Sequence, residues 1–294
     1  MKFLVNLIDK YLSLHNSILG AMLGELWGTF ILIVFGLGVI LQVELSNNQY
    51  GSFLSISLGW GFAVMLAVFW SGKLGHGHTN PAVTLAFASI GRLEWIRVPF
   101  YWLAQVVGAF LGSLVLFLIY YEKILDFAAN KDDGKFIVQS TGAFFITSRS
   151  TSLLTAFFDQ FFGTFLLASC AIAITDEDGF DLPDYLHPIM LGLMVSGIVG
   201  CFAMNAGAAL NPARDLGPRI MIAMCGWGRE AFTNLDFYFW VPIVAPLLGG
   251  VFGALFYEVF IGVHLHAKSK KSMSNNSANS KLIGSAETEV KVVG

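Results

Sequence analysis

The chain has 294 residues, of which 55% are hydrophobic and only 13% are charged, and its formal net charge is −3. Charged residues form about a quarter of an ordinary soluble domain, so this composition, with a mean hydropathy of +0.68, excludes a soluble enzyme and a disordered chain and predicts a protein that faces lipid. The negative charge argues against a nucleic-acid partner, and the three cysteines are too widely spaced for a metal motif or a disulfide framework.

The chain begins with a short amphipathic segment, residues 1–16. Apolar side chains recur there at helical spacing, but Asp9 and Lys10 interrupt them. This pattern is typical of a helix that lies at the membrane interface and not of a cleaved signal peptide.

Six apolar runs follow, each long enough to cross a bilayer core of roughly 30 Å as a helix. Two further apolar runs, 81–90 and 212–225, are half that length, and each follows a polar loop that contains glycine. Non-helical backbone at membrane depth is tolerated only where it is buried in protein or lines a wet cavity. The short runs therefore predict two re-entrant half-helices around a pore or a binding site. The six predicted crossings are residues 17–43, 52–71, 98–121, 153–175, 186–206 and 238–263.

The basic residues predict the orientation of these crossings. An even number of crossings places both termini on one side, and that side carries the larger share of the lysines and arginines. Because these residues collect on the cytosolic side, both termini are predicted to be cytosolic. From residue 267 to 294 the chain is rich in Ser, Asn and Lys, which predicts a disordered cytosolic tail after a channel domain at 17–266.

The sequence contains an internal repeat, about 17–121 and 153–263. Gly28 and Gly163 open matching Gly-Thr-Phe motifs 135 residues apart, and Asn80 and Asn211 open matching Asn-Pro-Ala motifs 131 residues apart. Each half has three crossings, and an odd number inverts one half relative to the other. The two half-helices therefore enter from opposite faces and meet near the midplane, as in inverted-repeat transport folds.

The residue types at this meeting point predict its chemistry. Asn80 and Asn211 can cap the half-helices, with Pro81 and Pro212 at the first helical position. Each Asn then offers N–H donors to the midplane, and two helix N-termini place partial positive charge there. A neutral solute that presents oxygen is favoured, and a cation or proton is opposed. Ala82 and Ala213 complete the two motifs.

At these residues the sequence resembles the aquaporin (major intrinsic protein) family, over nearly all of the chain outside the tails. Within that family it is similar to the glycerol-conducting aquaglyceroporin branch, because Arg214 is followed by Asp215 and then by Arg219. The resemblance implies an all-α membrane protein with the aquaporin fold, six transmembrane helices and two re-entrant half-helices. It also implies a homotetramer in which each subunit has its own pore.

The resemblance places the selectivity filter at Trp60, Val199 with its neighbour Gly200, Ala208 and Arg214. Ala208 stands where the branch often has an aromatic ring, so we expect a wider constriction that admits solutes larger than glycerol. A polyol is expected to lay its carbon chain against the Trp60 indole while the permanently charged Arg214 donates to its hydroxyls and repels cations. The alternative for Arg214 is a structural pair with Asp215. For Asp215 itself we expect a structural role in the half-helix, through backbone N–H groups or Arg219, in preference to contact with solute.

Buried polar residues near the half-helices have two interpretations each. A charge on Glu25, within an apolar crossing, is expensive and is expected to accept N–H bonds from a re-entrant loop; the alternative is proton transport. The second half has Gln160 where the family usually has Glu, so its loop is held more weakly or through the adjacent Asp159. His76 and His78 either fix the loop before Asn80 or alter the pore width on protonation.

The sequence therefore predicts a passive channel for glycerol, water and other small neutral solutes such as urea and polyols, excluding ions and protons, in a multi-pass protein of the plasma membrane. No nucleophile–base pair, nucleotide loop or metal cluster indicates an enzyme, a cofactor or a metal site. The alternatives are a water-selective aquaporin, which would have a His near Val199 or Gly200, a structural or junctional membrane protein with a closed pore, and an ion channel. The intact Asn80, Asn211 and Arg214 argue against the structural alternative, and the missing acidic ring argues against the ion channel.

Overall fold

The computed structural model describes Leu14 and residues 17–267, and in this part of the chain all regular elements are helices, with no strand. Most of the predicted interfacial segment 1–16 and all but the first residue of the predicted tail 267–294 lie outside the described residues. Six helical stretches are long and apolar enough to cross a membrane. Their main helices are α2 (Ile18–Leu45), α3 (Phe53–Gly75), α5 (Val98–Lys131), α6 (Leu153–Thr175), α7 (His187–Ala206) and α10 (Val241–Tyr257).

Three shorter α-helices connect or interrupt these crossings. They are α4 (Pro81–Ser89), α8 (Pro212–Ile222) and α9 (Glu230–Phe237). Single turns of tighter or wider helix join several of the elements, at Trp95–Arg97, Gly142–Phe144, Ala223–Trp227, Tyr238–Trp240 and Glu258–Gly262. The six crossings and the two half-helices, α4 and α8, are confirmed.

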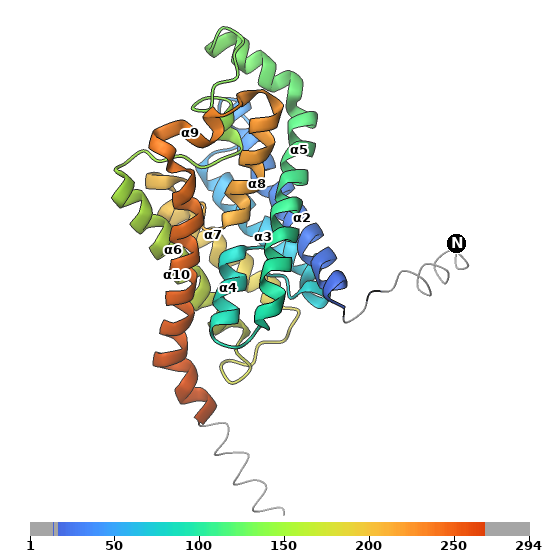
Figure 1. Cartoon of the computed structure of the whole chain (residues 1–294), viewed down its shortest axis with the longest axis vertical. Helices are drawn as coiled ribbons and strands as arrows, with labels where there is room; N and C mark the ends of the chain where they lie inside the picture. The colour runs from blue at the N-terminus through green and yellow to red at the C-terminus, as the bar shows by residue number, and fades with distance from the viewer. Residues whose placement is uncertain (1–13, 15–16, 268–294) are drawn as a thin grey trace, which may run out of the picture.

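The largest difference from the predicted boundaries is at α5. The apolar run predicts a helix over 98–121, whereas α5 continues to Lys131. Residues 122–131 contain charged side chains among good helix formers such as Leu125, Ala128 and Ala129, so the helix continues beyond the apolar run that spans the membrane. This extension forms one end of the molecule (Figure 1).

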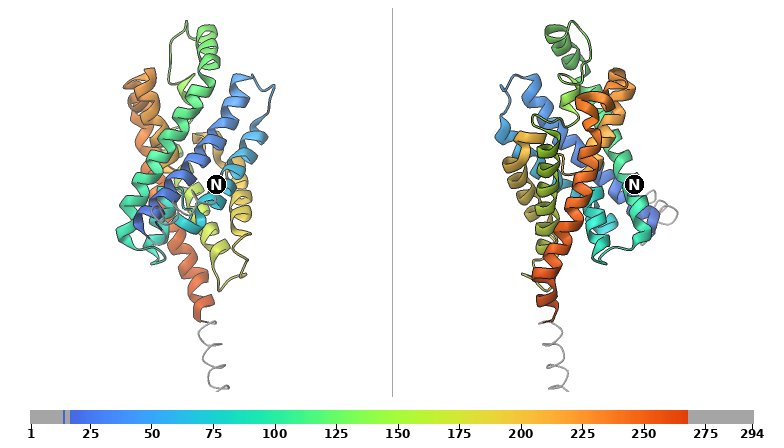
Figure 2. Two further views of the ribbon diagram at one scale, coloured as in Figure 1. Left: turned by 90° about the vertical axis from the view of Figure 1, so that its right-hand side faces the viewer. Right: turned by 60° about the vertical axis from the view of Figure 1, so that its left-hand side comes forward.

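The half-helix of each half of the chain packs against a crossing of the other half. Helix α2 packs against α3 and α5, and α6 packs against α7 and α10, while α3 and α7 join the halves. Half-helix α4 packs against α10 of the other half, and α8 packs against α5. Figure 1 shows α8 above α4 in the middle of the bundle. The turned views show the helical segment that continues α10, residues 258–267, extending beyond the other helices (Figure 2).

Glycine allows the closest of these contacts. A Cβ at Gly108 of α5 would collide with the carbonyl oxygen of Leu26 in α2, and a Cβ at Gly249 of α10 would collide with that of Phe161 in α6. The two pairs occupy corresponding places in the two halves. Small residues thus set the helix spacing around the two half-helices.

Candidate functional site

The two half-helices meet through their capping asparagines. Asn80 Oδ1 accepts from the backbone N–H of Ala82 at 2.8 Å, and Asn211 Oδ1 accepts from Ala213 at 3.0 Å. The amide groups cross between the halves: Asn80 Nδ2 donates to the Leu210 carbonyl at 3.0 Å, and Asn211 Nδ2 donates to the Thr79 carbonyl at 2.8 Å. Each amide carries two N–H donors, so each Asn keeps a second donor after this reciprocal bond.

The residues just before the asparagines have strained backbone. Thr79 has φ 48° and Leu210 has φ 54°, in the left-handed region that a β-branched or bulky residue seldom adopts. Such residues persist only where their surroundings hold them. In both halves a buried side chain at the same place in the repeat does this.

Glu25 holds the first loop. Its carboxylate is fully buried and accepts from the backbone N–H of His78 at 2.9 Å and of Thr79 at 2.6 Å. Gln105 of α5 also donates to it, at 2.8 Å, and to Thr84 of α4 at 2.9 Å. The three hydrogen bonds that Glu25 accepts fit its expected supporting role.

Gln160 holds the second loop in the same way. Its Oε1 accepts from the backbone N–H of Leu210, and its Nε2 donates to the Ala206 carbonyl, both at 3.0 Å. Asp159, the alternative support, takes no part, because its buried carboxylate oxygens have no hydrogen-bond partner among the described residues. An amide therefore suffices in this half, since one oxygen and one N–H complete the two bonds.

A cavity of about 580 Å³ leads from the two asparagines to the end of the molecule where α10 projects. We name it the vestibule. One part of its wall is apolar, with Leu32, Val83 and Leu167, and the loop 76–80 forms a polar part. This division suits a solute with a carbon face and a hydroxyl face.

Both loop histidines line the vestibule. His76 Nδ1 lies 2.7 Å from the hydroxyl of Tyr101, and the two imidazole centroids are 5.7 Å apart. His78 Nδ1 is buried without a hydrogen-bond partner. His76 thus contacts α5 through Tyr101. The His78 ring lies in the wall of the vestibule beside Phe87.

Two of the filter candidates contact each other directly. The guanidinium carbon of Arg214 lies 4.8 Å from the centroid of the Trp60 ring. Arg214 also donates to the Phe145 carbonyl at 3.0 Å. Both side chains are buried, at 4% and 8% exposure. The guanidinium and the aromatic ring are therefore in direct cation–π contact at the predicted filter.

The other filter candidates separate into two groups. Val199 and Ala208 are buried in the same hydrophobic cluster as Trp60. Gly200 is exposed on α7, so it does not share the buried side of Val199 and we leave it out of the filter. Ala208 has φ 44°, in the left-handed region. Its side chain is a single methyl group, so this position contributes no ring to the predicted filter.

Asp215 and Arg219 form a buried ion pair beside the filter. Arg219 Nη2 lies 2.7 Å from both carboxylate oxygens of Asp215. The guanidinium also donates to the carbonyls of Ala231 at 2.6 Å and Thr147 at 3.1 Å. The pair thus ties α8 to α9 and to the loop that contains Thr147. This is the structural role expected for Asp215, and Arg214 remains outside the pair.

Sequence reasoning missed two contributors to this site. Gln105 carries a signal, because it is an amide inside an apolar crossing, and its partner Glu25 lies in another crossing. The Phe145 carbonyl carries none, because every residue has a carbonyl and only the fold brings this one to Arg214.

Comparison with known proteins identifies one matching family and several similar relatives. Residues 13–257 match the model of a family described as "Major intrinsic protein". Human Aquaporin-9 is 40% identical over 258 residues, which cover 86% of each chain. Aquaglyceroporin-2 of Rhizophagus irregularis is 39% identical over 236 residues, 80% of this chain and 74% of that one.

A solved structure has the same fold. The X-ray structure of the aquaglyceroporin from Plasmodium falciparum superposes with a TM-score of 0.76 at 32% identity, and covers 85% of this chain and 100% of that one. The expected fold, and the likeness to aquaglyceroporins, are confirmed.

Proposed function

The chain belongs to the major intrinsic protein family, and we propose that it is a passive channel through which glycerol, water and other small neutral solutes cross a membrane down their gradients. It is a multi-pass integral membrane protein of a family of transporters. The proposal includes a homotetramer in lipid with a pore in each subunit, both termini in the cytosol, a place in the plasma membrane and no catalytic activity.

The observation that carries the proposal is the reciprocal pair of asparagines. Asn80 and Asn211 each use one N–H across the midplane and keep one. Two helix N-termini point at the same place, so the local field is positive. An oxygen of a neutral solute is stabilised there, while a cation or a proton meets repulsion. A channel of this kind needs no energy source other than the gradient.

The filter supports glycerol in preference to water alone. Trp60 presents an apolar ring directly beside the N–H donors of Arg214, so a polyol that passes this pair can use both at once. A water-selective aquaporin would have a His near Val199. With Ala208 in place of a ring, we extend the proposed solutes to urea and larger polyols.

Glycerol uptake and ionic current test this function together. Reconstituted native protein should speed the entry of labelled glycerol into vesicles relative to protein-free vesicles, and it should carry no current above background in a planar bilayer. Ionic current that accompanies glycerol entry would contradict the proposal, and so would an absence of both.

A further inference from the structure

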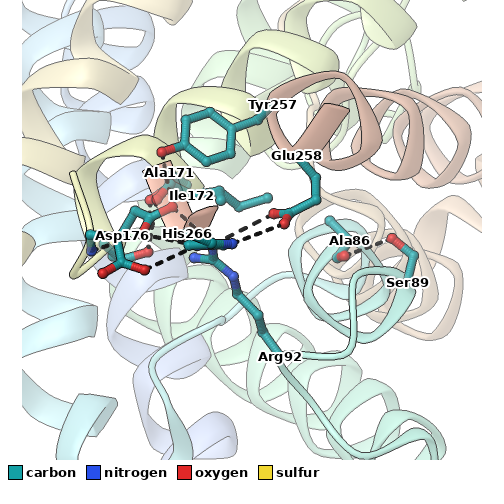
Figure 3. Close-up of polar contacts among 11 residues, drawn as sticks. Ala86, Ser89, Arg92, Ala171, Ile172, Asp176, Tyr257, Glu258 and His266 are labelled. Atoms are coloured by element: carbon teal, nitrogen blue, oxygen red, sulfur yellow. Dashed lines mark hydrogen bonds and ion pairs between the residues drawn. The ribbon is translucent and has the colours of Figure 1, made fainter. Parts of the chain in front are cut away.

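A second group of polar side chains lies at the open end of the vestibule, remote from the asparagines. Asp176 and Asp178 follow the end of α6, and His266 lies in the last described turns after α10. Figure 3 shows Asp176 and His266 facing each other, with Arg92 and Glu258 around them. The proposed function uses none of these side chains.

The distances between the possible ligand atoms of this group are close to those between the ligands of a bound metal ion. His266 Nε2 is 3.6 Å from Asp176 Oδ1 and 3.7 Å from Asp178 Oδ2, and one ligand atom from each residue lies within 4.8 Å of the others. A tetrahedral Zn²⁺ site with bonds of about 2.0–2.2 Å has edges of about 3.3–3.6 Å. Two of the three edges therefore need little adjustment.

The second nitrogen of His266 has its own carboxylate. Nδ1 lies 3.3 Å from Glu258 Oε1. A neutral imidazole has one N–H, and with that proton toward Glu258 the Nε2 lone pair faces two carboxylate oxygens. Three ligand atoms that can accept then lie within 4.8 Å of one another. A carboxylate behind a histidine is also the arrangement that orients histidines which bind metals.

The surrounding contacts fix the Asp176 carboxylate. Its Oδ2 accepts from Arg92 and from the Tyr257 hydroxyl, both at 3.0 Å. Its Oδ1 accepts from the backbone N–H of Asp178 at 3.1 Å and lies 3.6 Å from His266 Nε2. The ligand carboxylate is thus held in position by its neighbours before an ion binds.

The net charge of this group of side chains also favours a divalent cation. Asp176, Asp178 and Glu258 contribute three negative charges, and Arg92, 3.0 Å from Asp176 and 3.7 Å from Glu258, contributes one positive charge. The three carboxylates and the guanidinium together have a net charge of −2. A divalent cation neutralises it.

We propose that Asp176, Asp178 and His266 form a binding site for one divalent transition-metal ion, with Zn²⁺ as the best match. One imidazole nitrogen and two carboxylate oxygens suit Zn²⁺, whereas Ca²⁺ and Mg²⁺ prefer six or more oxygens. The fourth position opens to the vestibule. A bound ion ties the segment after α6 to the end of α10 at the rim of the path. This site goes beyond the proposed channel function and does not depend on it.

Zn²⁺ binding to the full chain, purified in detergent with any affinity tag removed, tests the proposal. Calorimetric titration at pH 7.4 should give one site per chain. His266→Ala and Asp178→Asn should each weaken binding about tenfold or more, and Glu258→Gln should weaken it about tenfold through the orientation of the imidazole. His264→Ala is the matched control, because His264 is exposed on the same helical segment, and it should bind Zn²⁺ as the native chain does.

Several results would overturn the proposal. They are a native chain that binds no Zn²⁺, a His266→Ala variant that binds it as tightly as the native chain, and a His264→Ala variant that loses it. Binding of Ca²⁺ that matches that of Zn²⁺ would overturn the choice of metal class. If His266→Ala fails to elute as a single folded species, Asp178→Asn decides, because its side chain is one-third exposed and the substitution keeps its shape.

Discussion

At the scale of single residues, the buried guanidinium of Arg219 holds together the structure beside the predicted filter. It pairs with Asp215 at 2.7 Å and donates to the carbonyls of Thr147 and Ala231. Arg219→Leu leaves the buried Asp215 carboxylate without its partner, so we expect the free energy of unfolding to fall by about 3–5 kcal/mol. Denaturant titration in detergent micelles measures this change.

Asp236→Ala is the control for that substitution. Asp236 pairs with Arg149 at 2.8 Å, but its side chain is 88% exposed. Exposed pairs contribute about 0–1 kcal/mol, so we expect little change in stability. Equal losses in the two variants would contradict the structural role of the Asp215–Arg219 pair.

Glu25 differs from Gln160 in the number of backbone donors it satisfies. Two N–H groups, of His78 and Thr79, each use a separate oxygen of Glu25. Glu25→Gln keeps only one acceptor oxygen, so one buried N–H loses its partner and the free energy of unfolding should fall by about 1–3 kcal/mol. Glycerol uptake should fall as well, since the loop before Asn80 lines the vestibule.

Glu44→Gln provides the comparison, because Glu44 lies on the same helix and is exposed. It should leave both stability and uptake unchanged. If Glu25→Gln keeps native stability and uptake as well, the carboxylate does not hold the loop.

At the scale of elements, α4 and α8 depend on each other. Each capping asparagine binds the carbonyl before the other one. In a double-mutant cycle of Asn80→Ala and Asn211→Ala, we therefore expect the losses in unfolding free energy to be non-additive by about 0.5–3 kcal/mol. Losses that add within about 0.5 kcal/mol would show that the half-helices are stabilised independently.

The elements themselves could be predicted because their signals are local. Apolar run length predicts the crossings, and Asn-Pro predicts the start of α4 and of α8. The partners of these elements could not be predicted in the same way. Asp176 and His266 lie far apart in the sequence and come together only because α6 packs along α10. Likewise, Gln160 rather than Asp159 holds its loop because of the direction each side chain takes from α6.

At the scale of the whole molecule, the outer helices expose many large apolar side chains, among them Phe62, Trp70 and Phe252. Such a surface is covered by lipid or by other subunits. For the proposed homotetramer, native mass spectrometry of the protein released from detergent should give a mass four times that of the 32.1 kDa chain. A mass of one chain over the working concentration range would contradict the tetramer and leave the pore within each subunit unaffected.

The central claim is that this chain conducts glycerol through a filter widened at Ala208. Stopped-flow light scattering on proteoliposomes tests it most directly, with water, glycerol, urea and a larger polyol as solutes, for the native chain and for Ala208→Phe. We predict rapid glycerol entry for both proteins and entry of the larger polyol only for the native one. Passage of water alone through the native chain would contradict the account.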